Sequence, residues 1–131
     1  MSATVLVDTN AYTSLLRGNA QVLDAIASAE LVYFSTIVVG ELLAGFRGGT
    51  RQASNEDRLH SFLKKDSVRV LDVTLETADC FGRIWHSLKT AGTPIPLNDV
   101  WIAAHAIETG SILLTFDGHF SRVPGLRLWQ R

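Results

Sequence analysis

Residues 4–10 read TVLVDTN, in which the apolar residues Val5, Leu6 and Val7 run directly into Asp8. A short run of this kind, without polar alternation, predicts a strand that is buried on both faces of a parallel sheet. A carboxylate at the end of such a strand is unexpected without a partner or a functional role, because burying an unpaired charge costs free energy. The apolar residues 112–116 end in the same way, at Asp117. Two predicted strands therefore each end in an acid.

The rest of the chain alternates between short β-branched runs and longer segments with a helical period. Strands are predicted over residues 4–8, 31–35, 68–72, 111–116 and 126–129. Helices are predicted over residues 11–17, 20–29, 36–46, 55–65, 75–91 and 98–109, with caps at Asn19, Ser35 and Thr74 and stops at Gly92 and Gly110. Strands separated by helices predict an α/β fold, with a mainly parallel sheet covered by helices on both faces.

The position of the two acids follows from this architecture. In an open parallel sheet the functional crevice lies beyond the carboxyl ends of the strands. Asp8 and Asp117 both lie at predicted carboxyl ends. We therefore expect them at the rim of the sheet and not inside its core.

Length and composition limit the class of protein. A chain of 131 residues has the usual size of one domain, and we expect a single domain over residues 1–131. Its 47% hydrophobic and 19% charged residues are typical of a globular protein. No apolar run reaches the roughly 18 residues that cross a bilayer, and Asp8 interrupts any signal-peptide core, so we expect a cytoplasmic protein without a membrane partner. The single cysteine, Cys80, excludes an internal disulfide and a cysteine-based metal site.

Two predicted helices contribute further acids. Glu41 is the single charge in the apolar helix over residues 36–46. Asp99 lies in the first turn of the helix over residues 98–109, which is apolar on nearly all sides. Helical spacing places Asp99 on one stripe with Ala103 and Ala106, and these small residues allow close packing against a neighbouring element.

Each acid also has a structural interpretation. Asp99 can complement the positive end of its helix, which is worth about 0.3–1 kcal/mol. Asp117, followed by Gly118, can form a turn, and Asp8 can start a turn at the next helix. Taken together, four acids in apolar surroundings favour one shared site.

A shared site of this composition predicts a metal ion. Carboxylates within about 4–6 Å push one another toward protonation, and a hard divalent cation removes that cost. Oxygen ligands suit Mg²⁺ or Mn²⁺, whereas zinc is disfavoured because the four histidines lack zinc-ligand spacing (His60, His86, His105 and His119). His119 is interpreted as an exposed loop residue, with a phosphate contact as the alternative. A carboxylate-held metal that activates water suits hydrolysis of phosphodiesters.

Five segments together resemble the PIN-domain ribonucleases, in particular the VapC-type toxins of bacterial toxin–antitoxin pairs. They extend from one end of the chain to the other: VLVDTN at 5–10, STIVVGELLAG at 35–45, IPLNDVWIAAHAI at 95–107, LLTFDGHF at 113–120 and VPGLRLW at 123–129. Any one of these segments is a weak match. Their order and spacing make the resemblance strong.

The resemblance implies a three-layer α/β/α fold around a five-stranded parallel sheet in the order 3-2-1-4-5. It also implies an endoribonuclease that depends on Mg²⁺ or Mn²⁺. The family's acidic residues correspond to Asp8, Glu41, Asp99 and Asp117. Asn10 and Thr115 match positions near the metal, where they are expected to hydrogen-bond the carboxylates or a water on the metal. His119 departs from the pattern, because some members carry a further acid there.

The resemblance further implies three partners: an RNA substrate, a second copy of the chain in a homodimer, and a cognate antitoxin whose arginine enters the acidic site. The net charge of −1 gives no general attraction for RNA. Arg47 and Arg51 follow the helix that carries Glu41 and are expected to guide the RNA backbone, the alternative being an ordinary solvated face. Trp101 or Tyr12 can stack on a base if exposed, although for Trp101 packing in the core or in a dimer is favoured.

Two other classes remain as alternatives. An aspartyl-phosphate protein also places acids at strand ends with Mg²⁺, but a phosphatase of that class needs Asp-x-Asp, and Asn10 occupies its third position. A response-regulator receiver needs a late lysine, and no lysine follows Lys89. A non-catalytic PIN-like binding module, in which the acids hold a structural ion or a basic peptide, is the second alternative.

Overall fold

The central strand of the sheet is formed by the residues of the apolar run that ends at Asp8. The structure, a computed structural model, describes residues 3–130, so residues 1, 2 and 131 of the expected domain lie outside it. Its five strands form one parallel sheet in the order β3-β2-β1-β4-β5, as predicted. The strands are β1 (Thr4–Val7), β2 (Leu31–Ser35), β3 (Val68–Leu71), β4 (Ile112–Leu114) and β5 (Arg127–Leu128).

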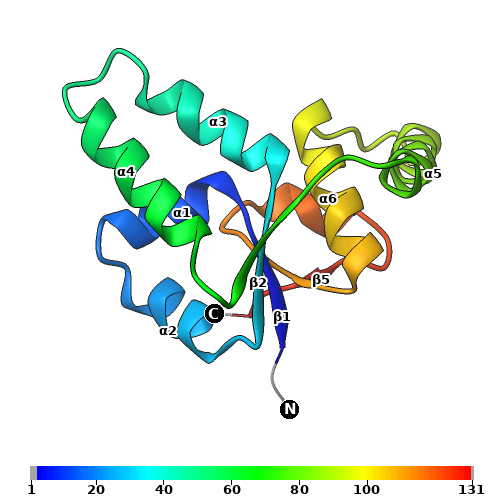
Figure 1. Cartoon of the computed structure of the whole chain (residues 1–131). Coiled ribbons are helices and arrows are strands. Elements are labelled where there is room, and N and C mark those ends of the chain that lie inside the picture. The colour runs from blue at the N-terminus through cyan, green and yellow to red at the C-terminus, as the bar shows by residue number, and fades with distance from the viewer. Residues whose placement is uncertain (1–2, 131) are drawn as a thin grey trace.

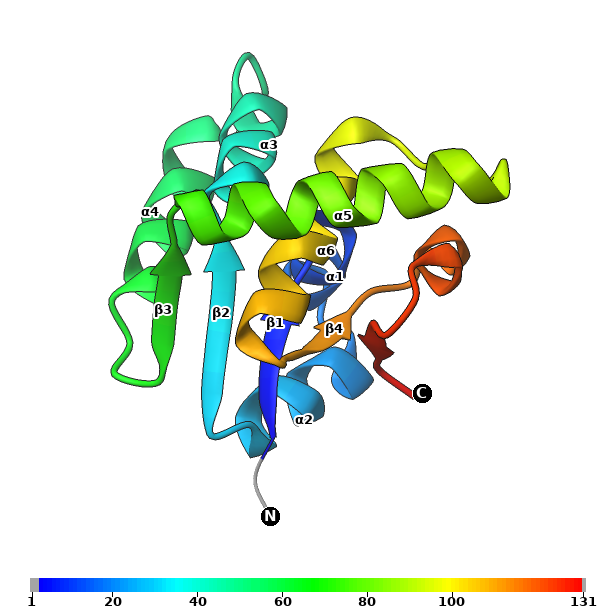
Figure 2. The ribbon, with the colours of Figure 1, turned by 90° about the vertical axis from the view of Figure 1, so that its right-hand side faces the viewer.

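Helices cover both faces of this sheet, which gives the predicted three layers (Figure 1). The helices are α1 (Thr9–Leu16), α2 (Ala20–Ser28), α3 (Thr36–Phe46), α4 (Gln52–Leu63), α5 (Leu75–Ala91) and α6 (Leu97–Thr109), followed by the short 3-10 helix η1 (Gly118–Arg122). In Figure 1, α1, α2 and α4 lie on one side of the sheet, and α6 lies on the other side with α5 beyond it. The α3–α4 hairpin extends past the carboxyl ends of the strands (Figure 2).

The predicted helix ends are confirmed at the positions where a capping residue was identified. Asn19, Ser35 and Thr74 each accept a hydrogen bond from a backbone N–H in the first turn of α2, α3 and α5. Gly92 and Gly110 end α5 and α6 in the left-handed conformation that glycine adopts without strain.

The strand predictions at the site were too long. Residues 4–8 were predicted as a strand, but β1 ends at Val7 because Asp8 caps α1, which therefore begins at Thr9 and not at residue 11. Residues 111–116 were predicted as a strand, but β4 ends at Leu114. The 3-10 helix η1 was not predicted, and α4 begins at Gln52, before the predicted residue 55.

The core lies on both faces of β1 and β4. The side chains of Leu6, Val7, Leu113 and Leu114 are fully buried. Tyr12 is 1% exposed and packs edge-on against Phe34 and Phe62. Stacking of Tyr12 on an RNA base was expected only if the ring were exposed, and this condition is not met because the ring belongs to the core. Within residues 3–130, the helices are too short or too polar to cross a membrane.

Truncation of Leu6 tests the importance of the central strand. Leu6 is 0% exposed, so Leu6→Ala removes buried methyl groups and is expected to lower the free energy of unfolding by about 2–5 kcal/mol. Urea denaturation followed by circular dichroism measures this change. Leu23→Ala is the matched control, because Leu23 is 54% exposed, and its effect should stay within about 0.5 kcal/mol.

Candidate active site

The four predicted acids come from four separate parts of the fold. β1 pairs with β4 so that Val7 lies beside Leu114, and the backbone N–H of Asp8 donates to the Leu114 carbonyl at 3.2 Å. Asp8 and the segment that leads to Asp117 therefore leave the sheet side by side. Glu41 lies midway along α3, and Asp99 lies in the first turn of α6.

Asp8 is held rigidly where β1 meets α1. Its Oδ1 accepts a hydrogen bond from the backbone N–H of Ala11 at 2.8 Å, and its Oδ2 accepts one from the hydroxyl of Thr115. The side chain thus caps α1, so the structural interpretation of Asp8 is correct. Asp8 is 5% exposed, which corrects the expectation that it lies at the rim outside the core.

The environment of Asp8 disfavours its charged form. Burial raises the pKa of Asp8 to about 6, and the charges of Asp99 and Asp117 act in the same direction. The hydrogen bonds from Thr115 and Ala11 oppose this shift. Asp8 is therefore close enough to both other acids to feel their charges.

Asp99, Asp117 and His119 form the tightest part of the site. The Nε2 of His119 lies 2.7 Å from Oδ2 of Asp99, and its Nδ1 lies 3.1 Å from Oδ1 of Asp117. The His119 side chain is only 20% exposed. The interpretation of His119 as an exposed loop residue is therefore wrong, because η1 turns its ring back between the two acids.

Glu41 approaches this group from α3. The hydroxyl of Thr9 donates to Glu41 Oε1 at 2.7 Å, and the Asn98 side-chain amide donates to Oε2 at 3.4 Å. Burial raises the pKa of Asp99, with smaller contributions from Glu41 and Asp117, while His119 lowers it. Glu41 therefore belongs to the same electrostatic group as the other three acids.

Sequence reasoning missed Thr9, Asn98 and the bridging role of His119. Each of them lies within two residues of a predicted acid, and that proximity was the available signal. Of the two predicted supporting residues, Thr115 contacts Asp8 and also accepts a hydrogen bond from the Asp117 backbone N–H at 3.0 Å. The Asn10 side chain makes no hydrogen bond to these acids within residues 3–130, and its predicted role stays a prediction.

The donor set fits a divalent cation. One ligand atom from each of Asp99, Asp117 and His119 lies within 4.8 Å of the other two. Opposite ligands of an octahedral ion with bonds of about 2.1 Å lie about 4.2 Å apart, so a small adjustment of these side chains would bring the three atoms into a single ion's shell. Burial, and to a smaller extent the neighbouring carboxylates, raises the pKa of Asp8 and of Asp99, so the charged forms of both acids are disfavoured. A cation among them would stabilise these charged forms.

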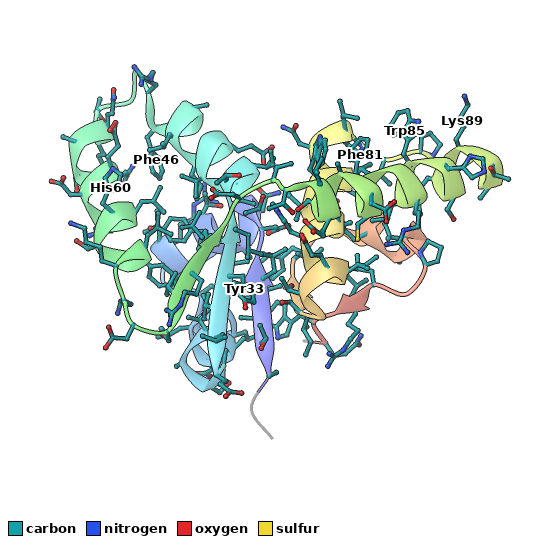
Figure 3. The ribbon with its side chains drawn as sticks, turned by 45° about the vertical axis from the view of Figure 1, so that its right-hand side comes forward. Tyr33, Phe46, His60, Phe81, Trp85 and Lys89 are labelled. Atoms are coloured by element: carbon teal, nitrogen blue, oxygen red, sulfur yellow. The ribbon has the colours of Figure 1, made fainter. Side chains whose placement is uncertain are left out.

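The predicted RNA-contacting residues lie outside this group. Arg47 and Arg51 are exposed at the two ends of the loop that joins α3 to α4. Trp101 stacks on Phe81 of α5 with ring centroids 4.0 Å apart, and Phe81 in turn lies parallel to Trp85 (Figure 3). Trp101 thus packs between α6 and α5, as the packing interpretation predicted.

The class of protein follows from this fold and its acidic site. Residues 5–126 match the PIN domain, and the chain therefore belongs to the PIN domain family. Ribonuclease VapC2 of Rickettsia felis is 29% identical over 107 residues, which cover 81% of this chain and 78% of that protein. The plasmid stability protein StbB of Pseudomonas syringae pv. tomato is 33% identical over 121 residues, or 86% of this chain and 87% of that protein.

Solved structures of toxin–antitoxin proteins share the fold. VapBC2 from Rickettsia felis, bound to a DNA fragment from its promoter, contains a chain that superimposes with a TM-score of 0.83 at 25% identity, covering 97% of this chain and 99% of that chain. VapBC-1 from nontypeable Haemophilus influenzae gives a TM-score of 0.83 at 25% identity and 97% coverage of each chain. The similarity extends over the elements that carry all four acids.

The raised pKa of Asp8 predicts how stability depends on pH. Burial raises the pKa of Asp8 from its ordinary value of 3.8 to about 6 in the folded state, so the folded protein binds the proton more tightly than the unfolded chain does. The metal-free protein should therefore lose about 1 kcal/mol of stability between pH 5 and pH 7 through this group. Urea denaturation in a chelator at both pH values measures the change. Asp8→Asn should not show the loss of stability that comes from titration of Asp8. An identical pH dependence in both proteins would contradict the raised pKa of Asp8.

The hydroxyl of Thr115 should tune the same acid. Thr115→Ala removes a hydrogen bond that favours the ionised carboxylate, so it is expected to raise the pKa of Asp8 further. Thr115→Ser keeps the hydroxyl and should leave the pKa close to that of the wild-type protein. Carboxyl ¹³C chemical shifts recorded through a pH titration follow Asp8 directly.

Proposed function

We propose that this protein is a metal-dependent endoribonuclease, the toxin component of a VapBC-like toxin–antitoxin pair, formed by a single PIN-type nuclease domain. The observation that carries the proposal is the convergence of Asp8, Glu41, Asp99 and Asp117 from four elements into one electrostatic group. Membership of the PIN family and relatives named as VapC ribonucleases support it.

The four acids share one task in this proposal, and neighbouring groups fix their orientation. Asp99 and Asp117 together with Asp8 and Glu41 hold Mg²⁺ or Mn²⁺. A cation held there would polarise a water molecule and offset charge on the phosphate during hydrolysis. Thr115 and the Ala11 N–H fix the Asp8 carboxylate, while Thr9 and Asn98 orient Glu41. The orientation of each carboxylate is thus set before substrate arrives, which avoids reorganisation during the reaction.

RNA reaches the site along the α3–α4 hairpin. Arg47 and Arg51 are exposed on that hairpin and supply positive charge that attracts the phosphate backbone. Asp8 is buried at the floor of the site and Asn98 is exposed at its edge. The scissile phosphate therefore approaches from the side of Asp99, Asp117 and Glu41.

Protein partners are part of the same proposal. VapBC structures share the fold at 25% identity, which supports an antitoxin as the partner of this chain. An antitoxin arginine suits the site, because a guanidinium can pair with its carboxylates. A second copy of the chain completes a homodimer.

The family match and the sequence weigh against an aspartyl-phosphate protein. Residues 5–126 match the PIN domain, and Asn10 stands where a phosphatase of that class needs its second aspartate. The non-catalytic binding module differs only in lacking cleavage, so measured activity decides between it and the nuclease.

Asp8→Asn and Asp99→Asn test the nuclease directly. Each variant removes one negative charge from the metal site and is expected to lower the rate of RNA cleavage at least 100-fold, because the cation is held less tightly. A labelled total-RNA substrate incubated with Mg²⁺ or Mn²⁺ provides the measurement. The matched control is Asp24→Asn, an exposed acid of α2, which should cleave like the wild-type protein. Normal cleavage by both site variants would overturn the proposal.

Metal binding should also be visible without RNA. Mn²⁺ or Mg²⁺ is expected to raise the melting temperature of the wild-type protein, because an ion that binds only the folded state stabilises it by mass action. Asp8→Asn should not respond to the ion, yet in chelator at pH 8 it should melt at least as high as the wild-type protein, since it no longer buries a charge. A wild-type protein that binds neither ion would exclude the metal mechanism.

A further inference from the structure

The position of His119 gives this site a nitrogen donor next to its carboxylates. Its two ring nitrogens lie 2.7 Å from an Asp99 oxygen and 3.1 Å from an Asp117 oxygen. The ring also packs against Phe120 with centroids 5.0 Å apart, and Phe120 is buried. The imidazole is therefore directed at the acids by the η1 turn and by packing.

The other described histidines lie elsewhere. His105 is buried, and its Nε2 lies 3.1 Å from the Asp72 carbonyl oxygen. His86 is exposed on α5, and His60 is exposed on α4, in the hairpin at the opposite side of the molecule from Trp85 in Figure 3. A histidine signal from the metal site can therefore be assigned to His119.

We propose that His119 is a ligand of the divalent cation and donates one ring nitrogen beside the carboxylates of Asp99 and Asp117. This inference rests on the metal site of the proposed function and deepens it. It follows from the three ligand atoms, which lie within 4.8 Å of one another. The ring nitrogen that binds the cation would give up its hydrogen bond to one carboxylate, while the other ring nitrogen can keep its hydrogen bond to the second carboxylate.

A nitrogen ligand changes which metal the site prefers. Mg²⁺ takes oxygen ligands and retains its waters, whereas imidazole binds the later first-row ions more strongly, in the order Mn²⁺ < Fe²⁺ < Co²⁺. His119 therefore shifts the preference of the site away from Mg²⁺ and toward transition ions. An aspartate at the same position would restore an all-oxygen set, which favours Mg²⁺.

A different role for His119 would leave the metal preference unchanged. If the ring only orients Asp99 by a hydrogen bond, it stays outside the ligand shell, as histidine-carboxylate pairs around metals often do. In that case the ion would have oxygen ligands alone. The two roles differ in whether a metal–nitrogen bond exists, and that bond can be measured without RNA.

Pulsed electron paramagnetic resonance on the Mn²⁺-loaded protein tests for the bond. The wild-type protein is expected to show the strong nitrogen coupling of a directly bound imidazole, and labelling histidine with ¹⁵N should change that coupling. His119→Asp should keep the Mn²⁺ signal and lose the nitrogen coupling. His86→Ala, an exposed histidine on α5, is the matched control and should match the wild-type spectrum.

Titration calorimetry with Mg²⁺ and Co²⁺ gives the second measurement. The ratio of the Mg²⁺ to the Co²⁺ dissociation constant should fall about tenfold in His119→Asp relative to wild type. His119→Ala should weaken Co²⁺ more than Mg²⁺, and its circular dichroism spectrum checks that it folds. Mn²⁺ bound without nitrogen coupling, or an unchanged ratio in His119→Asp, would overturn the inference and leave the proposed nuclease intact. If Asp8→Asn loses cleavage while the His119 variants bind both metals like the wild-type protein, the inference about His119 is likewise overturned and the proposed nuclease stays intact.

Discussion

The burial of Asp8 between β1, α1 and Thr115 is the constraint on which the site depends. Its carboxylate caps α1 by accepting a hydrogen bond from the backbone N–H of Ala11, and it accepts another from the hydroxyl of Thr115, just after β4. Asp8 therefore connects the first strand, the first helix and the segment that carries Asp117. The same burial raises its pKa to about 6. The Asp8 side chain thus fixes the local structure, and its burial disfavours its own charged form.

The fold brings the other three acids close to Asp8. Acids from α3, α6 and the end of β4 are held near Asp8 by strand pairing and by the hydrogen bonds of Thr9 and Asn98. Without a cation, the imidazole of His119 is the nearest group that can interact favourably with Asp99 and Asp117. The charged carboxylates can be stabilised by a metal ion, by a basic side chain of a partner or by His119. Of these three, only the metal ion can also activate water for the hydrolysis of a phosphate ester.

The fold could be predicted from the sequence to the extent that local signals determine it. Caps such as Ser35 and Thr74, and glycines such as Gly92, fix helix ends through their own hydrogen bonds or backbone conformation, and these ends were correct. The four acids could be found because each is polar in an apolar run. The contacts of His119 with Asp99 could not be found in the same way, since they depend on how η1 packs back on α6. The burial of Tyr12 likewise depends on β2 and α4, which contribute Phe34 and Phe62.

The strand order has a consequence for synthesis. Asp8 lies at the end of the central strand and its neighbour β4 supplies Thr115 and the turn that carries Asp117 and His119, although more than a hundred residues separate them in sequence. The complete group of acids cannot exist on the ribosome before translation has passed residue 117. A nascent chain of this protein therefore lacks the complete site until the segment that follows β4 has been made and has packed beside Asp8.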